Sequence, residues 1–353
     1  MKENKMKFDV TFHPSWWNEK LGISFSEEFF DNPRYRIESD LRMRKFFFEK
    51  FGKWGIGEET PSPRPLLGSD LIASGYLFSQ LLGCEVRFGE NIPPEVLSAG
   101  LTDDEAAGFI APNIKESPLW QKVEEQISWL LKEYGQVHSA LNLQGVLNLA
   151  LDLRGESIFI DMYQDKNLAE RLLNQCFELL ASSGKRLSDV SYSLSGGVTA
   201  ITNSLDMTGL YVHSNCSVEM VSLENYRDFL QEYDIRLSGM FQPYGIHHCG
   251  QSMEHVVGGY AAVPELSFAE VGAGSDIETV RKFLPDCWLN LRYSPVRLAK
   301  VEAKELKEEL RDMYRQAGGK GSETSISCVG IDSSVPDRQV DLFLEIAKEL
   351  GDS

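Results

Sequence analysis

The chain has 353 residues, with 35 Lys and Arg against 53 Asp and Glu, which gives a formal net charge of −18. Hydrophobic residues make up 42% of it and charged residues 25%, the proportions of a globular protein rather than a disordered chain. An acidic surface repels phosphate backbones and anionic lipid, so the composition argues against nucleic acid and against a membrane surface as partners.

The first residues hold no apolar core of signal-peptide length, and no later run approaches the ~18 apolar residues of a membrane span. We therefore expect a cytoplasmic protein whose cysteines are reduced. Their wide, irregular spacing is unlike a disulfide framework. The six are Cys84, Cys176, Cys216, Cys249, Cys287 and Cys328.

Residues 1–65 read as an N-terminal, mainly helical extension that packs over the remainder of the chain. It contains the aromatic pair Trp16 and Trp17, and it ends in a segment with three prolines in five residues, 61–65. Prolines at that density exclude a helix and favour an extended connector. The sequence thus divides at residue 65, with a second domain over 66–353.

From residue 137 onward, short apolar runs alternate with long amphipathic segments, which is typical of parallel β/α units. Strands are predicted over 137–143, 198–205, 240–249, 265–271, 287–292 and 324–331. The spacing between them favours an α/β fold of the (β/α)8 TIM-barrel type. A doubly wound open sheet is the structural alternative, but the chain lacks the G-x-G-x-x-G turn of a dinucleotide site.

The strongest local signal for chemistry is His247-His248-Cys249, at the carboxyl end of a predicted strand. Because strand side chains alternate between faces, His247 and Cys249 point the same way and His248 the other. An imidazole and a thiolate on one face are half of a zinc site.

Cys328 lies near the carboxyl end of the last predicted strand. In a parallel barrel all carboxyl ends meet at one face, so Cys328 is expected to join His247 and Cys249 there. One His and two Cys ligands leave a tetrahedral zinc with an open position, the pattern of a catalytic metal.

These residues resemble the uroporphyrinogen decarboxylase-like superfamily, and within it the zinc-dependent cobalamin (corrinoid) methyltransferases. The zinc of that branch is held by an H-x-C pair and a distant Cys, which His247, Cys249 and Cys328 match one by one. Segments 68–88, 145–155 and 220–229 are also similar to family segments. The resemblance implies a (β/α)8 barrel, a bound Zn²⁺ and a corrinoid carried by a partner protein.

The resemblance implies transfer of a methyl group between a small methylated substrate (a methyl ether, thioether or thiol) and the corrinoid protein. We favour the direction from the methylated donor to the corrinoid, because Trp16 and Trp17 are typical of an apolar pocket edge. True decarboxylases carry an Arg-rich motif where this chain reads His-Pro-Ser-Trp-Trp at 13–17. A decarboxylase with an altered substrate and a non-catalytic tetrapyrrole- or corrinoid-binding barrel remain the alternatives.

Several further side chains are candidates for binding substrate because they lie near predicted strand ends or in the N-terminal aromatic segment. Asn is also frequent at strand ends because it satisfies turn backbone, and Cys216 is alternatively a fourth ligand or a packed thiol. The substrate-binding candidates are Trp17, Asn142, Asn203, Cys216, Tyr244, Glu270 and Asn290.

Overall fold

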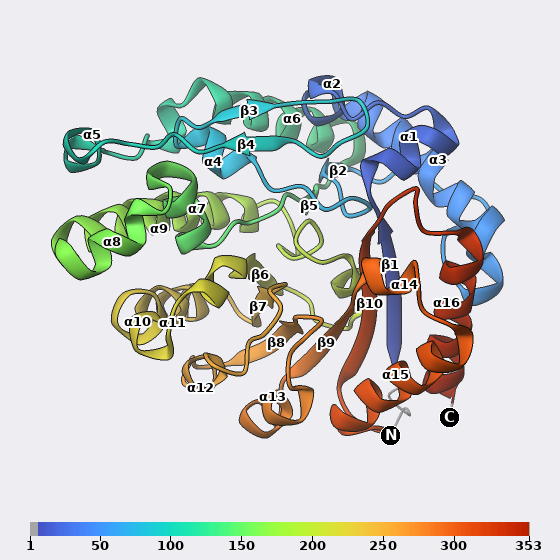
Figure 1. Cartoon of the computed structure of the whole chain (residues 1–353). Helices are drawn as coiled ribbons and strands as arrows, with labels where there is room; N and C mark the ends of the chain where they lie inside the picture. Colours follow the sequence, from blue (N-terminus) through green and yellow to red (C-terminus); the bar gives the residue numbers. More distant parts are fainter. Residues whose placement is uncertain (1–5, 353) are drawn as a thin grey trace.

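Short, almost continuously buried runs along the second half of the chain form parallel strands, as predicted. The structure, a computed structural model, describes residues 6–352. Six strands pair in parallel in one sheet, in the spatial order β1-β10-β9-β8-β7-β6, and Figure 1 shows that this sheet is curled. Their bounds are β1 (Lys7–Phe12), β6 (Tyr211–Ser214), β7 (Tyr244–His248), β8 (Leu266–Val271), β9 (Trp288–Tyr293) and β10 (Thr324–Ile331).

The predicted (β/α)8 barrel is confirmed in part, as a curled parallel half-barrel. A separate parallel pair, β2 (Leu66–Gly68) and β5 (His138–Ala140), lies beyond β6, the last strand of the curled sheet. The curled sheet and this pair together are called the ring. Among the residues that the structure describes, isolated bridges alone, Gln144 with Ser214 and Leu194 with Tyr211, join this side to β6. Within residues 6–352 no ladder joins β1 to β2, so a complete eight-stranded barrel is not formed. A small antiparallel hairpin, β3 (Glu85–Arg87) with β4 (Glu95–Leu97), lies outside the ring.

Helices cover the outer face of the curled sheet, and α10 to α13 follow its strands in turn (Figure 1). The helices of the first half are α1 (Pro14–Leu21), α2 (Glu27–Asp31), α3 (Pro33–Phe51), α4 (Leu77–Leu81), α5 (Asp103–Gly108), α6 (Pro118–Tyr134), α7 (Val146–Arg154), α8 (Ser157–Gln164) and α9 (Lys166–Ser188). Those of the second half are α10 (Leu223–Phe229), α11 (Gln231–Met240), α12 (Val257–Tyr260), α13 (Ile277–Phe283), α14 (Pro295–Leu298), α15 (Ala303–Gln316) and α16 (Asp337–Asp352). Four short 3-10 helices complete the set: η1 (Gly52–Trp54), η2 (Ile114–Glu116), η3 (Ala200–Ser204) and η4 (Cys216–Met220). No helix among residues 6–352 is both long and apolar enough to cross a bilayer.

One predicted strand is wrong. Within 198–205, residues Ala200–Ser204 form η3 and the others are not in a strand, although the β-branched residues of this segment suit a sheet. The hydroxyl groups of Thr202 and Ser204 each donate to the carbonyl oxygen three residues earlier, Thr199 O at 2.7 Å and Ile201 O at 2.8 Å. Such local bonds offer the backbone an alternative to a ladder.

The N-terminal segment is less separate than the sequence suggested. Strand β1 joins the main sheet beside β10 and so belongs to the barrel itself. Helices α1 and α3 then pack their aromatic residues on it, with Trp16 and Trp17 almost completely buried against Phe12 and Phe47. The division at residue 65 stays a prediction. Strand β1 lies before it in sequence but pairs with β10, which lies after it.

The carboxyl group of Asp9, on β1, has no cationic partner among residues 6–352. Asp9 accepts a hydrogen bond from the backbone N–H of Val10 at 2.8 Å. Burial, and secondarily the charge of Asp70, raise the pKa of Asp9 from 3.8 to about 7. Ionised Asp9 therefore destabilises the fold, and this loss of stability develops as the pH rises from about 4 to about 7.

Asp9→Asn is expected to raise the free energy of unfolding by about 1–3 kcal/mol at pH 8 and by far less at pH 4, because the wild-type carboxyl is already protonated there. Urea denaturation at the two pH values measures the difference. Asp286→Asn, which replaces an exposed carboxyl, is the control. An equal effect of Asp9→Asn at both pH values would contradict the prediction.

Candidate metal centre

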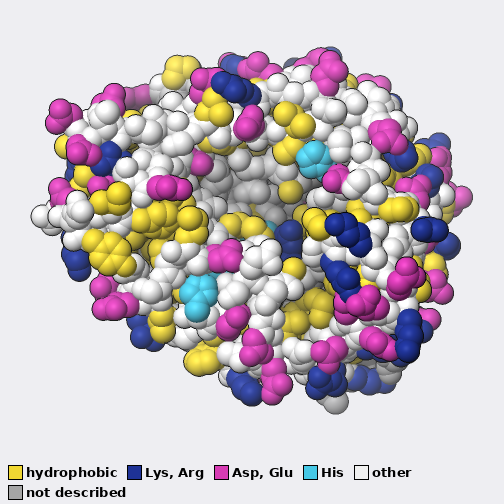
Figure 2. All heavy atoms as spheres, viewed as in Figure 1, with side chains coloured by type: hydrophobic (Ala, Val, Ile, Leu, Met, Phe, Trp, Pro, Cys, Tyr) yellow, Lys and Arg dark blue, Asp and Glu magenta, His cyan; other side chains and the backbone are white. Residues whose placement is uncertain are grey.

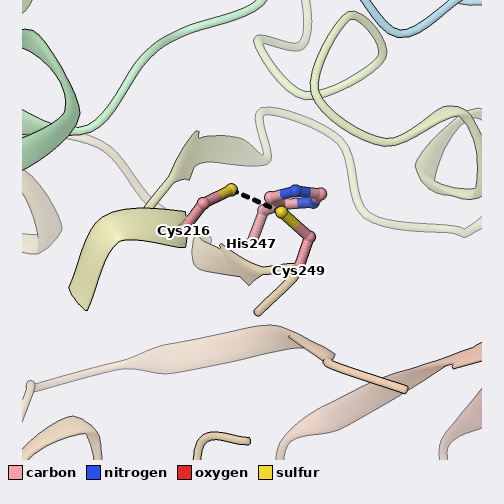
Figure 3. A group of neighbouring side chains, drawn as sticks. All are labelled: Cys216, His247 and Cys249. Carbon is pink, nitrogen blue, oxygen red and sulfur yellow. Dashed lines mark hydrogen bonds between the residues drawn. The ribbon is translucent and has the colours of Figure 1, made fainter. Parts of the chain in front are cut away.

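Two thiols and an imidazole come together at the carboxyl ends of strands β6 and β7. Cys216 begins η4 just after β6, His247 lies within β7, and Cys249 directly follows β7. One ligand-type atom from each of the three lies within 4.8 Å of the other two. Figure 3 shows the two sulfur atoms directed toward each other beside the imidazole. The predicted proximity of His247 and Cys249 is thus present, with Cys216 as their neighbour.

The loops that carry the two cysteines are bound to each other. The side chain of Glu219, in η4, accepts a hydrogen bond from the backbone N–H of Gln251 at 2.8 Å. A Cβ atom on Gly250 would lie 2.3 Å from the Glu219 carboxylate, so only glycine permits this approach. The connection after β6 and the connection after β7 therefore form one unit around the cysteines.

A buried carboxylate holds the imidazole in place. Glu270, in β8, lies 2.6 Å from His247 Nδ1 through Oε2, and its Oε1 accepts from Arg292 Nη1 at 2.8 Å. Burial alone would raise the pKa of Glu270, but the positive charges of His247 and Arg292 hold it down at about 2. With Nδ1–H donated to a carboxylate, Nε2 is the nitrogen left to bind a metal ion, the usual arrangement behind a ligating histidine.

The two sulfur atoms lie 2.6 Å apart and share a hydrogen bond. This bond and the charge of His247 lower the pKa of Cys249, whereas the same bond and burial raise the pKa of Cys216. A thiolate therefore forms first at Cys249, next to a thiol that a divalent cation would deprotonate.

The residues present fit zinc. Thiolate sulfur and imidazole nitrogen are the ligands that Zn²⁺ prefers, and three protein ligands leave a fourth position for a substrate or water. The Glu270 contact supplies the outer partner that such a histidine needs.

Cys328 is not part of this group. By register it pairs with Tyr293, whose ring packs on Phe343 of α16, so both side chains belong to the helix-covered face of the sheet. The neighbouring Ser327 is on the inner face, where it accepts a hydrogen bond from Asn290. Cys328 as a zinc ligand stays a prediction from the resemblance, and the structure brings Cys216 to the other two instead.

Three of the substrate-binding candidates lie at or near the centre: Cys216, which is part of it, Asn142 and Glu270. Asn142, just after β5, accepts a hydrogen bond from Ser214 Oγ at 3.2 Å, and Ser214 is the register partner of His247. Asn142 is therefore bonded to the strand residue that lies beside His247. Glu270 is fully buried and supports His247 rather than facing a substrate.

Four other candidates are buried or bonded to other residues, and their roles in substrate binding stay predictions. Trp17 is sealed in the aromatic cluster around Phe12, which removes the basis for an aromatic pocket edge. Tyr244 starts β7 and donates to Asp234 of α11, on the helix side of the sheet. Both amide atoms of Asn290 bond to serines of β10, and Asn203 donates to the buried Asp70.

The sequence reasoning passed over the residues that support the centre: Asn215, Glu219 and Asp234. Asn215 and Glu219 are close to Cys216 in the chain, but nothing in their spacing relates them to Cys249 or to α11. Arg292, on β9, supports the centre through its ion pair with Glu270, and nothing in the local sequence relates these two residues.

The surface is hollowed at its centre in the view of Figure 2, and hydrophobic side chains gather on one rim of the hollow. The strands of the curled sheet in Figure 1 run toward this hollow. Carboxyl ends of parallel strands are where enzymes of this architecture place their chemistry.

Comparison with known proteins supports the fold. No protein-family model and no curated protein sequence matches the chain. Among solved structures, a methyltransferase from Methanosarcina mazei matches with a TM-score of 0.66 at 15% identity, over 99% of this chain and 94% of that one. A B12-independent methionine synthase from Shewanella sp. W3-18-1, in complex with selenomethionine, matches with a TM-score of 0.51 at 11% identity, over 99% and 96%. The chain therefore shares its fold with these barrel proteins, as the resemblance to the uroporphyrinogen decarboxylase-like superfamily implied.

Proposed function

We propose that the protein is a zinc-dependent methyltransferase that moves a methyl group between a small methylated substrate and a corrinoid protein. The observation that carries the proposal is the cluster of Cys216, His247 and Cys249 at the carboxyl ends of β6 and β7. Its support is the fold shared with a methyltransferase and a methionine synthase. The substrate classes are a methyl ether, a thioether or a thiol.

In this proposal Cys216, His247 and Cys249 hold the zinc ion. Bound zinc supplies Lewis acidity, which either activates a thiol as a thiolate or polarises the atom that carries the methyl group. Glu270 keeps the His247 imidazole oriented through Nδ1, and Arg292 offsets the buried charge of Glu270. The proposal gives Asn142, which is bonded to Ser214 next to His247, the role of orienting a substrate.

The corrinoid partner is proposed from the sequence resemblance and from charge. With a net charge of −18, this protein would attract an electropositive docking face. In this proposal the partner docks over the hollow that Figure 2 shows in this face of the protein.

The decarboxylase alternative has less support. Decarboxylation of a polyanionic porphyrinogen needs several cationic side chains to hold its carboxylates. The arginine on the inner face beside the centre, Arg292, is committed to Glu270.

Metal analysis of cysteine variants tests the ligand set. Cys216→Ser and Cys249→Ser should each reduce bound zinc from about one equivalent to a small fraction, because each removes one of three protein ligands. Cys328→Ser and the packing control Cys84→Ala should retain zinc. If Cys216→Ser retains zinc and Cys328→Ser loses it, Cys216 does not have the role given to it. That result would support His247, Cys249 and Cys328 as the ligands, as the resemblance implies.

Glu270→Gln should weaken zinc binding about 10- to 100-fold, because it removes the charged acceptor behind His247 while keeping the side chain's shape. Competition with a chromogenic chelator measures the affinity. Glu309→Gln is the matched control, since Glu309 forms its ion pair with Arg297 away from the centre. Equal affinities for the two variants would contradict the role of Glu270.

Methyl transfer is read from the cobalamin spectrum. Zinc-loaded protein should convert Co(I) cobalamin to methylcobalamin with at least one methyl ether, thioether or methylated thiol, or transfer the methyl group of methylcobalamin to a thiol. Cys249→Ser should lose the activity. Zinc-loaded protein that is inactive in both directions across all these classes would contradict the proposal and favour a non-catalytic binding barrel.

A further inference from the structure

The side chain of Asp234 lies behind the metal centre, in a buried polar cluster between strands β6 and β7 and helices α10 and α11. Its oxygen atoms accept from Asn215 Nδ2 at 2.9 Å, from the Tyr226 hydroxyl at 2.6 Å and from the Tyr244 hydroxyl at 3.1 Å. The His213 ring is a further neighbour, 3.1 Å away through Nε2. Asp234 is 2% exposed, so these bonds fix its carboxylate without competition from water.

Of these partners, Asn215 is the one that is directly connected to candidate metal ligands. It immediately precedes Cys216, and its backbone N–H donates to the carbonyl oxygen of His247 at 2.7 Å. The same residue is thus bound to a second candidate ligand through its backbone and to α11 through its side chain. Ser217, on the other side of Cys216, is also anchored: its N–H donates to Asn148 Oδ1 at 3.1 Å.

Steric contact restricts the same segment from a third direction. A Cβ atom on Gly145, at the start of α7, would lie 2.1 Å from the Ser214 carbonyl oxygen and 2.9 Å from Asn215 Oδ1. The segment that leads into Cys216 is therefore enclosed by α7, β7 and α11.

From this geometry we infer that Asp234 is a positioning residue for the metal centre, acting through the side-chain amide of Asn215 to place the sulfur of Cys216. The inference rests on the proposed function, in which Cys216 binds zinc. A ligand held in place before the metal arrives loses less conformational freedom on binding, so the contact should raise metal affinity. Asp234 itself does not touch the metal.

Asn215→Ala removes the amide and should weaken zinc binding about 10- to 100-fold, as outer contacts of metal ligands do. Asp234→Asn keeps the shape but has one oxygen acceptor instead of two, and should weaken binding in the same direction. Tyr226→Phe is the matched control: it removes a buried hydrogen bond to Asp234 of similar kind but leaves Asn215 bonded, so zinc affinity should change less than twofold. Thermal unfolding of all three variants reports the purely structural cost.

A double-mutant cycle locates the effect at Cys216. Zinc and Co²⁺ affinities are measured by chelator competition in the intact protein, with the thiolate-to-cobalt absorption band as a second readout. In a Cys216→Ser background, Asn215→Ala should change affinity less than twofold, because the group it positions is no longer a thiolate. In the wild-type background it should also shift the cobalt band.

An equal loss in both backgrounds, or a Tyr226→Phe variant that binds as weakly as Asp234→Asn, overturns the positioning role while the proposed function stands. If Cys216→Ser binds too weakly to titrate, the comparison of Asp234→Asn with Tyr226→Phe decides alone. A wild-type protein that binds neither metal overturns the proposed function, and this inference with it.

Discussion

A completely buried carboxylate has to be compensated, and in this protein the compensation is shared between two strands. Glu270 lies on β8, between His247 of β7 and Arg292 of β9, and bonds to both. An uncompensated charge at that depth would cost several kcal/mol, so the three strands must keep their register for the fold to be stable. The same register directs His247 toward the cysteines. The strand register that keeps Glu270 compensated therefore also fixes the geometry of the candidate centre.

The polar residues behind the sheet extend this arrangement outward. Asp234 joins α11 to the segment before Cys216, and Glu219 joins that segment to the backbone after Cys249. Each bond is ordinary by itself. Together they connect a helix, two strands and two loops around two sulfur atoms, which is how a site on loops becomes as well defined as one on rigid elements.

Local patterns predicted much of this molecule. The alternation of apolar runs gave parallel strands close to their observed bounds, such as Thr324–Ile331, and strand periodicity correctly placed His247 and Cys249 on one face. What local patterns did not specify depended on distant contacts. The position of Cys216 beside Cys249 is set by the bond between two loops, and the burial of Trp17 is set by the placement of α3. The face of Cys328 follows from the register of β10 with β9, which one sequence alone does not specify.

The three ligand-type residues come from two adjacent strands: Cys216 follows β6, His247 lies in β7 and Cys249 follows β7. A metal ion bound there would cross-link one corner of the sheet and leave the far side, around β1 and β2, untouched. Its binding energy would then protect amides locally against hydrogen exchange instead of raising the stability of the whole ring. The half of the barrel that is joined to β6 by isolated bridges would remain the part that opens most readily.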